Sequence, residues 1–215
     1  MSYKAVIFDL DGTLIDSLED LADAVNCALS CFGLQVHSLQ SFRKMVGDGT
    51  RTLISRALPA DKQQLLEPVL DKMRQRYFET CLNKSRPYKG IEAVLAKLKK
   101  AAIKMAVLTN KDQKMAQKMI EHFFGKDCFN VIRGTFDSIA VKPDPAALLE
   151  VLEKLGVNAD EAVFVGDSNI DIHTAKAAKM ASIGVNWGFR GEDELRAAGA
   201  DFVINQPNEL LQYLQ

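Results

Sequence analysis

The sequence lacks an excess of either charge, and it lacks any long apolar segment. Its 27 basic and 28 acidic side chains leave a formal net charge of −1, so there is no electrostatic reason to expect nucleic acid or an anionic membrane as a partner. No apolar run approaches the ~20 residues that a membrane-spanning helix needs. The apolar stretch ending at Phe8 is too short for the apolar region of a secretion signal. We therefore expect a cytoplasmic protein that binds small ligands.

Cysteine is scarce, and its spacing is not that of a metal site. Cys27, Cys31, Cys81 and Cys128 contain no Cys-x-x-Cys pair and lie within otherwise apolar patterns. Such residues are usually reduced thiols packed in the core of an intracellular protein. The sequence also has no internal repeat and no low-complexity tract. A thiol-based metal site or nucleophile is therefore not favoured.

What the sequence does contain is a regular alternation of apolar runs and helical patterns. Residues 4–8 and 104–108 have the composition of buried strands, and polar residues follow each run. Strands separated by helices at this spacing predict right-handed βαβ units, hence an α/β fold with a mainly parallel sheet covered on both sides. The other expected strands are 130–133, 161–165, 181–185 and 201–204, and the main expected helices between strands are 91–100, 116–123, 170–178 and 192–198.

Residues 16–85 interrupt this alternation. Apolar residues recur three and four positions apart from Leu18 to Leu29, which predicts one apolar stripe on a helix. More helical patterns follow, and the block contains no convincing strand. We therefore predict two domains. Residues 1–15 and 86–215 form the α/β core, and residues 16–85 form a helical domain inserted after the first strand.

Polar residues follow the expected strands at the places where a parallel sheet would bring them to one edge. Several carboxylates held within a few ångströms repel one another unless protons or a cation compensate their charge. The edge therefore predicts a metal-assisted site in which one acid stays free to do chemistry. Its candidate residues are Asp9, Asp11, Thr109, Asn110, Lys142, Asp167 and Asp171.

This set of side chains suits phosphoryl transfer, which needs a nucleophile, positive charge for the phosphoryl oxygens and a proton donor for the leaving oxygen. Asp9 is the candidate nucleophile, which would form an aspartyl-phosphate. Asp11 would protonate the leaving alkoxide and then deprotonate the attacking water. Mg²⁺ would bind Asp9, Asp167 and the backbone carbonyl of Asp11. Thr109 and Lys142 would hold the phosphoryl oxygens.

Further candidates support these residues or select the substrate. Gly12 lets the backbone bend sharply after the acids, and Asn110 with the helix after it fits a phosphate-binding turn. We place both with the phosphate-binding residues. Ser168 is a supporting residue that could equally cap the following helix. Arg51 and Arg56 could reach a substrate carboxylate, because Arg suits planar anions, although such residues are more often exposed to solvent.

The motifs and their order resemble those of the haloacid dehalogenase superfamily, specifically its phosphatase branch. The matching segments are Asp-x-Asp-Gly-Thr, Thr-Asn after a middle strand, a later Lys-Pro, and Gly-Asp-Ser-x-x-Asp, and they span nearly the whole chain. The resemblance implies a Rossmann-like three-layer α/β/α core, with the helical domain as a mobile cap over the substrate. It also implies a nucleophilic Asp9, an acid/base Asp11 and Mg²⁺ at Asp167. Lys142 would hold the phosphate, and Asp171 would orient Lys142 or a metal-bound water.

Within the superfamily, segments such as Val-Leu-Thr-Asn-Lys and Val-Asn-Trp-Gly-Phe-Arg-Gly look most like phosphoglycolate phosphatases. The implied partner is a small phosphorylated metabolite, with 2-phosphoglycolate as one candidate, acted on by a monomer or homodimer. A phosphomutase of the same superfamily is an alternative, since it would return the phosphoryl group to a sugar. A receiver-type signalling domain also combines clustered acids with a Thr and a Lys, but it has no use for the inserted helices.

Overall fold

The computed structural model describes residues 3–136 and 142–214, and a six-stranded parallel sheet forms its centre. The strand order is β5-β4-β1-β6-β7-β8, so the chain builds outward on one side of β1 and then returns to build on the other. Open α/β sheets bind ligands at such a switch point, beyond the carboxyl ends of the strands. The strands are β1 (Ala5–Phe8), β4 (Lys104–Asp112), β5 (Val131–Thr135), β6 (Ala162–Gly166), β7 (Ala181–Val185) and β8 (Phe202–Ile204).

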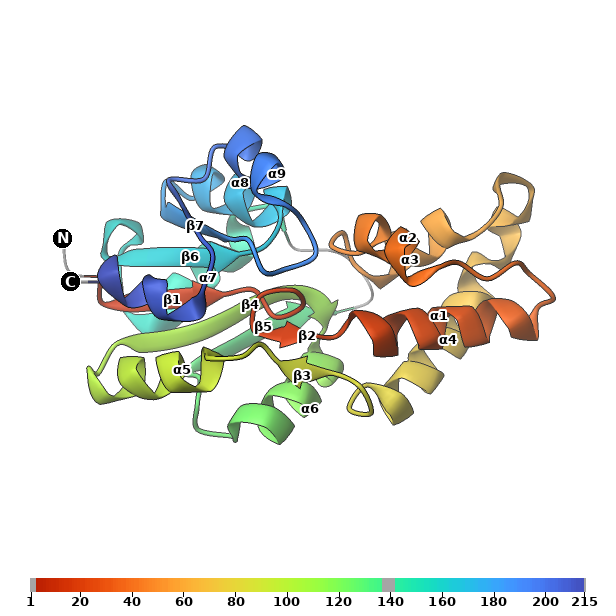
Figure 1. The fold of residues 1–215 in the computed structure, drawn as a ribbon, viewed down its shortest axis with the longest axis horizontal. Coiled ribbons are helices and arrows are strands. Elements are labelled where there is room, and N and C mark those ends of the chain that lie inside the picture. The colour runs from red at the N-terminus through yellow and green to blue at the C-terminus, as the bar shows by residue number, and fades with distance from the viewer. Residues whose placement is uncertain (1–2, 137–141, 215) are drawn as a thin grey trace.

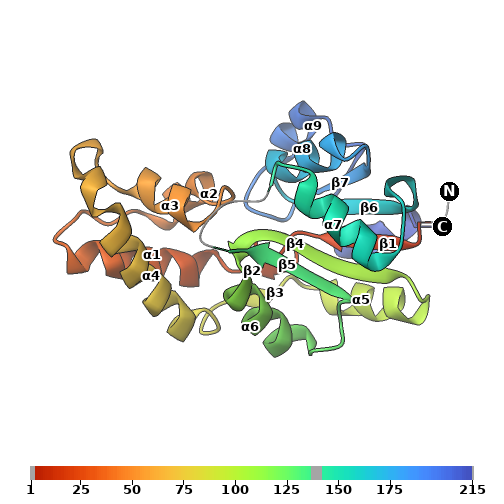
Figure 2. The same ribbon diagram turned by 180° about the vertical axis from the view of Figure 1, so that it is seen from behind.

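Helices cover both faces of the sheet, which confirms the predicted fold class (Figures 1 and 2). Alternate residues of β1 explain why, because Val6 and Phe8 pack in one core cluster while Ala5 and Ile7 pack in another. The first cluster includes α5 and α6, and the second includes α7 and part of α8. The helices are α5 (Ile91–Lys100), α6 (Gln113–Phe124), α7 (Ala146–Leu155), α8 (Asn169–Ala177) and α9 (Glu192–Ala198).

Four further helices form a block beside the carboxyl edge of the sheet (Figure 1). We call this the helical block: α1 (Leu18–Cys31), α2 (Leu39–Met45), α3 (Thr50–Ala57) and α4 (Leu66–Thr80). Two short strands, β2 (Ile15–Asp16) and β3 (Arg86–Pro87), pair antiparallel where the chain enters and leaves it. Three 3₁₀ helices complete the described elements: η1 (Ala60–Leu65), η2 (Ala159–Glu161) and η3 (Pro207–Gln212).

The two chain crossings are also tied together by a buried carboxylate. Asp20, in the first turn of α1, accepts backbone N–H bonds from Lys84 and Ser85, and its Oδ2 accepts a 2.8 Å bond from the Ser85 hydroxyl. Since Asp20 is 2% exposed, these bonds form where water does not compete with them. The entry and exit of the helical block are therefore held side by side.

One strand differs from the sequence prediction in a way that matters for the site. The pattern ends the second strand at residue 108, whereas β4 runs on to Asp112. Leu108 pairs with Arg133 and Asp112 with Thr135, so four steps along β4 match two steps along β5. Such a bulge turns side chains out of the regular ladder, and residues 109–111 lie within it.

No helix in the described part of the chain is both long and apolar enough to cross a bilayer.

Candidate active site

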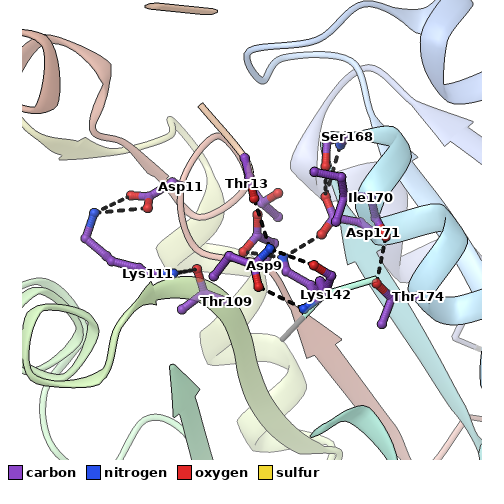
Figure 3. A network of polar contacts seen from close by, with 12 residues as sticks. Asp9, Asp11, Thr13, Thr109, Lys111, Lys142, Ser168, Ile170, Asp171 and Thr174 are labelled. Carbon is purple, nitrogen blue, oxygen red and sulfur yellow. Dashed lines mark hydrogen bonds and ion pairs between the residues drawn. The ribbon is translucent and has the colours of Figure 1, made fainter. Parts of the chain in front are cut away.

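Asp9 and Lys142 form the centre of a buried polar cluster (Figure 3). Asp9 follows β1, and its backbone N–H donates to Val165 at 2.9 Å, which holds it beside the end of β6. Lys142 Nζ lies 2.8 Å from Asp9 Oδ1 and 2.6 Å from Asp171 Oδ1. Burial acts to lower the pKa of Lys142, but the carboxylates of Asp171 and Asp9 outweigh it and raise that pKa. Lys142 is therefore a fixed positive charge beside Asp9.

Asp171 is placed by its own helix rather than by solvent. Its Oδ2 accepts bonds from the Ser168 backbone N–H at 3.0 Å and the Ser168 hydroxyl at 2.7 Å. These contacts belong to a capping box at the start of α8, and Asp171 is completely buried. One carboxylate oxygen thus caps the helix while the other contacts Lys142. Ser168, predicted as a supporting residue, lies in this network.

Three of the acids lie close enough together to hold a cation. Asp9, Asp167 and Asp171 each offer an oxygen, and these atoms lie within 4.8 Å of one another. Burial raises the pKa of Asp9 to about 7, and burial raises that of Asp167 well above its usual range. Asp9 Oδ1 accepts no aligned hydrogen bond from the described residues, although it has the ion pair with Lys142. Buried, under-compensated carboxylate oxygens are ligands that suit Mg²⁺.

The backbone packs tightly around Asp167. Its Oδ2 accepts a 2.7 Å bond from the Phe189 backbone N–H. A Cβ on Gly12, where φ is +84°, would lie 2.2 Å from Asp167 Oδ2, and one on Gly188 would lie 2.3 Å from the Asp167 Cβ. Both glycines are therefore required by close approach to the carboxylate, and at Gly12 also by the backbone conformation. Gly12 thus lies beside Asp167, where its visible role is in packing.

Thr109 and Asn110, from the bulge in β4, lie in the same cluster. Thr109 is 2% exposed, and its hydroxyl accepts a 3.2 Å bond from the backbone N–H of Lys111. The Asn110 amide bonds both backbone groups of Lys142, accepting from its N–H at 2.8 Å and donating to its carbonyl at 3.0 Å. Asn110 also donates to the carbonyl of Gly47, in the loop after α2. Its visible contacts therefore hold the Lys142 segment and join it to the helical block.

Asp11 points to a different lysine, one that the sequence analysis did not single out. Lys111 Nζ lies 2.9 Å and 3.0 Å from the two carboxylate oxygens of Asp11, and 2.7 Å from the hydroxyl of Tyr77 on α4. The Ser17 hydroxyl donates to the same carboxylate at 2.5 Å. Figure 3 shows Asp11 and Lys111 at the left of the cluster, with Asp9 and Lys142 at its centre. Each acid of the Asp-x-Asp motif thus has its own buried lysine.

A cavity of about 50 Å³ connects these groups. The sheet edge supplies its acids and lysines, and the helical block supplies the opposite wall, including Gly49, Thr50 and Leu53. Arg190, from the loop after β7, also lines the cavity and donates through one nitrogen to the carbonyls of Lys44 and Val46. Core and block are therefore bonded to each other beside the cavity, and the space between them suits a small ligand.

The two arginines proposed to read a substrate carboxylate lie elsewhere. Arg51 forms a paired contact with Glu67 on α4, with distances of 2.5 Å and 2.9 Å. Arg56 contacts Asp48 at 2.5 Å and donates to the Met45 carbonyl. Neither arginine lines the cavity. The structure therefore places both on ion pairs within the helical block and does not bring them together with the acids.

Two cavity residues missed by sequence reasoning are Lys111 and Arg190. Lys111 follows Thr-Asn directly, and the bulge that turns it toward Asp11 has no periodic signal. Arg190 lies in the Val-Asn-Trp-Gly-Phe-Arg-Gly segment. This segment is part of the resemblance to phosphoglycolate phosphatases, but the resemblance assigned no function to any single residue in it. The only signal in the sequence was a charged residue beside glycine-rich or strand-end sequence, and that pattern is too common to select a site residue.

Comparison with known proteins gives a consistent family relationship. A family model described as haloacid dehalogenase-like hydrolase matches residues 6–185. A phosphoglycolate phosphatase from Psychrobacter arcticus is 34% identical over 222 residues, covering 100% of this chain and 96% of that protein. An N-acetylmuramic acid 6-phosphate phosphatase from Pseudomonas aeruginosa is 32% identical over 217 residues, covering 100% of this chain and 96% of that protein.

A solved structure gives the same relationship in three dimensions. The crystal structure of a protein from Lactobacillus delbrueckii subsp. bulgaricus, provisionally described as a phosphoglycolate phosphatase, superposes with a TM-score of 0.92. The two chains are 30% identical, and the match covers 100% of this chain and 99% of the other. The similarity therefore extends over the helical block as well as the sheet.

Proposed function

The chain belongs to the haloacid dehalogenase-like hydrolase family, and from this premise we propose that it is a Mg²⁺-dependent phosphatase of a small phosphate monoester, with 2-phosphoglycolate as the leading substrate. One observation carries the proposal. Asp9 directly follows β1 at the switch point of the sheet, in contact with Lys142 and within cation-binding distance of Asp167. This combines a nucleophile with the positive charge that phosphoryl transfer needs.

In the first step, a carboxylate oxygen of Asp9 attacks phosphorus as the bond from phosphorus to the ester oxygen breaks. The leaving alkoxide takes a proton from the carboxyl group of Asp11 and departs as the alcohol. The products of this step are an aspartyl-phosphate on Asp9 and an ionised Asp11. Lys142 and Thr109 are the groups we assign to the phosphoryl oxygens, because both are buried at the cavity beside Asp9.

In the second step, Asp11 removes a proton from a water molecule, and the water oxygen attacks phosphorus. The bond from phosphorus to Asp9 breaks, so inorganic phosphate leaves and the Asp9 carboxylate is restored. Asp11 is protonated again and ready for the next ester. Atoms and protons balance over the two steps, since one ester and one water give one alcohol and one phosphate.

The metal is assigned to the oxygens of Asp9 and Asp167 and to the backbone carbonyl of Asp11. Asp171 is assigned to orienting Lys142 through their ion pair. Bound Mg²⁺ would neutralise negative charge on the phosphoryl oxygens and on the clustered acids. Without a cation, buried Asp9 and Asp167 have raised pKa values. A protonated Asp9 is a poor nucleophile, so a bound cation would also favour the ionised form that attacks phosphorus.

The size of the cavity supports a small substrate. At about 50 Å³, it is a few times the roughly 10–15 Å³ that a cavity needs in order to hold one water molecule. We treat residues 16–85 as a cap that admits the ester and closes over it. A two-carbon acid fits this enclosure with less movement of the cap than an amino sugar such as N-acetylmuramic acid, which the Pseudomonas aeruginosa relative is named for.

A substrate panel tests the proposal. Phosphate release is measured with Mg²⁺ from 2-phosphoglycolate, N-acetylmuramic acid 6-phosphate and several sugar phosphates, each with an EDTA control. We expect the highest kcat/KM for 2-phosphoglycolate and no turnover in EDTA. Conversion of one sugar phosphate isomer into another without phosphate release would establish a phosphomutase instead. Stoichiometric labelling with no turnover would establish a receiver-type module.

A further inference from the structure

Lys111, the buried lysine beside Asp11, has no role in the two steps of the proposed reaction. Its contacts indicate a role. We propose that Lys111 and Tyr77 position the carboxyl group of Asp11, so that the helical block controls acid catalysis through a side chain that does not contact the phosphoryl group. The inference rests on the proposed function, in which Asp11 is the proton donor. Lys111 and Tyr77 are positioning residues in this scheme.

The contacts of Lys111 are directed at the acid. Its ammonium group contacts both carboxylate oxygens of Asp11, at 2.9 Å and 3.0 Å. The same group donates to the Tyr77 hydroxyl at 2.7 Å and lies 4.5 Å from the centre of the Tyr77 ring. An ammonium group has three protons to donate, and the three oxygen contacts match that number. Lys111 thus has a defined position, and it fixes both oxygens of Asp11.

Burial makes this arrangement specific. Lys111 is 5% exposed and Tyr77 is 2% exposed, so a lysine without these partners would carry a large desolvation cost. Charge pairs are weakly screened at such a place. The orientation of Asp11 therefore depends on Lys111, and the orientation of Lys111 depends on Tyr77.

Two contacts in this network come from the helical side of the chain. Tyr77 lies on α4, and Ser17, which donates to Asp11 at 2.5 Å, directly precedes α1. Tyr77 also touches the core, with its hydroxyl 3.9 Å from the sulfur of Met119 on α6. The position of the proton donor is therefore set jointly by the sheet edge and the helical block. An enclosed substrate would meet an acid whose carboxyl group is already oriented.

The division of work between the lysines separates this role from phosphate binding. Lys142 contacts Asp9 and Asp171, whereas Lys111 contacts Asp11 and Tyr77. Removing Lys142 would affect the nucleophile and the phosphoryl oxygens for every ester. Removing Lys111 would affect Asp11, which as a proton donor in the first step matters only when the leaving oxygen is a strong base. Asp11 is also the base of the second step for every ester, so the two roles are separated by kcat/KM, which reports only the steps up to release of the alcohol.

The experiment compares two leaving groups in one enzyme. The alcohol released from 2-phosphoglycolate needs a proton, whereas p-nitrophenol leaves readily as its anion. We expect Lys111→Met to lower kcat/KM on 2-phosphoglycolate by about 100-fold, in the range typical of general acid catalysis, and kcat/KM on p-nitrophenyl phosphate by less than about threefold. Tyr77→Phe, which keeps the ring and removes the hydroxyl, should show the same selectivity with a smaller loss.

The chain offers a matched control in Lys118. Like Lys111 in β4, this lysine on α6 contacts α4, where it donates to the Phe78 carbonyl and lies 4.4 Å from the centre of the Phe78 ring. It makes the same kind of contact between core and block without touching Asp11. Lys118→Met should therefore leave the ratio of the two kcat/KM values unchanged, which separates positioning of the acid from general support of the interface.

The outcomes of this comparison are distinct. Equal losses of kcat/KM on both esters in Lys111→Met would overturn the proposal and assign Lys111 to phosphate binding. If Lys111→Met does not fold, Tyr77→Phe decides the matter, because that variant must still lose more activity on 2-phosphoglycolate than on p-nitrophenyl phosphate. Failure of the proposed function would look different, since the wild-type protein would then hydrolyse neither ester.

Discussion

The ammonium group of Lys142 lies 2.8 Å from Oδ1 of Asp9, in a site where both residues are at least nine-tenths buried. The proposed nucleophile is therefore oriented by a fixed positive charge before any substrate binds. Asp171 completes the arrangement by contacting the same ammonium group at 2.6 Å. Each component of this arrangement can be changed on its own, with a different expected result.

Asp9→Asn should abolish turnover while the protein still folds. An amide is a poor nucleophile, so kcat should fall by at least about 1,000-fold. Lys142 keeps its ion pair with Asp171, so its buried charge is not left unpaired and the fold should survive. Steady-state phosphate release and circular dichroism check the two parts. Asp23→Asn, on an exposed carboxylate of α1 that pairs with Lys84, is the control. Activity above a few per cent of wild type would exclude Asp9 as the nucleophile.

Asp167→Asn should weaken metal activation. Replacing an anionic ligand by a neutral one lowers affinity for a hard cation, and we expect the Mg²⁺ concentration for half-maximal activity to rise about 10-fold or more. Titration of activity against Mg²⁺, with direct calorimetric binding of the metal alone, measures this. An unchanged activation curve would remove Asp167 from the metal site.

The metal-free protein should lose stability as pH rises toward neutrality. Burial raises the pKa of Asp9 from 3.8 to about 7, and burial raises the pKa of Asp167 in the same direction. Between these values the folded state keeps protons that the unfolded chain has released, so stability is full below about pH 4 and is lost as pH increases through 7.

Thermal unfolding in EDTA, from pH 5 to pH 8, tests this prediction. The wild-type Tm should decrease over the range, and Asp9→Asn should flatten the decrease because its side chain does not titrate. Mg²⁺ should raise Tm more at pH 8 than at pH 5, since the cation binds the ionised carboxylates. A Tm in EDTA that rises steadily with pH would show that these acids are ionised in the metal-free fold.

Gly188→Ala should damage the site through backbone packing alone. The added Cβ would lie 2.3 Å from the Asp167 Cβ and 2.5 Å from the Gly12 carbonyl oxygen, so we expect a loss of about 1–3 kcal/mol in unfolding free energy and weaker metal activation. Gly191→Ala is the matched control, because no atom of the described residues lies within 4 Å of the place that its added methyl group would take. Equal stability of the two variants in denaturant titrations would contradict the crowding.

The sequence predicted the fold well because two different periodicities carry it. Apolar strand runs such as Ala5–Phe8 and the helical stripe from Leu18 onward depend on simple burial. The antiparallel pair β2 and β3 was missed because two residues are too few to show a period. Strand-end acids such as Asp9 and Asp167 could be placed because the carboxyl ends of parallel strands share one edge.

Lys111 could not be found in this way, since its orientation comes from the register shift between β4 and β5. The contacts of Arg51 and Arg56 could not be predicted from the sequence either. Whether a surface arginine faces a cavity or pairs with a carboxylate such as Glu67 depends on tertiary packing between helices. Hydrophobic patterns in the sequence predict which residues are buried better than they predict the partner of a charged side chain.

The stereochemical course at phosphorus tests the central claim, transfer through an aspartyl-phosphate. The substrate would be the phosphorothioate analogue of 2-phosphoglycolate, in which one sulfur atom and two different oxygen isotopes make the phosphorus chiral. It would be hydrolysed in water that carries the third oxygen isotope. Each in-line displacement inverts the configuration, so attack by Asp9 followed by attack of water predicts net retention. Net inversion would mean that water attacks the ester directly, and it would contradict the role proposed for Asp9.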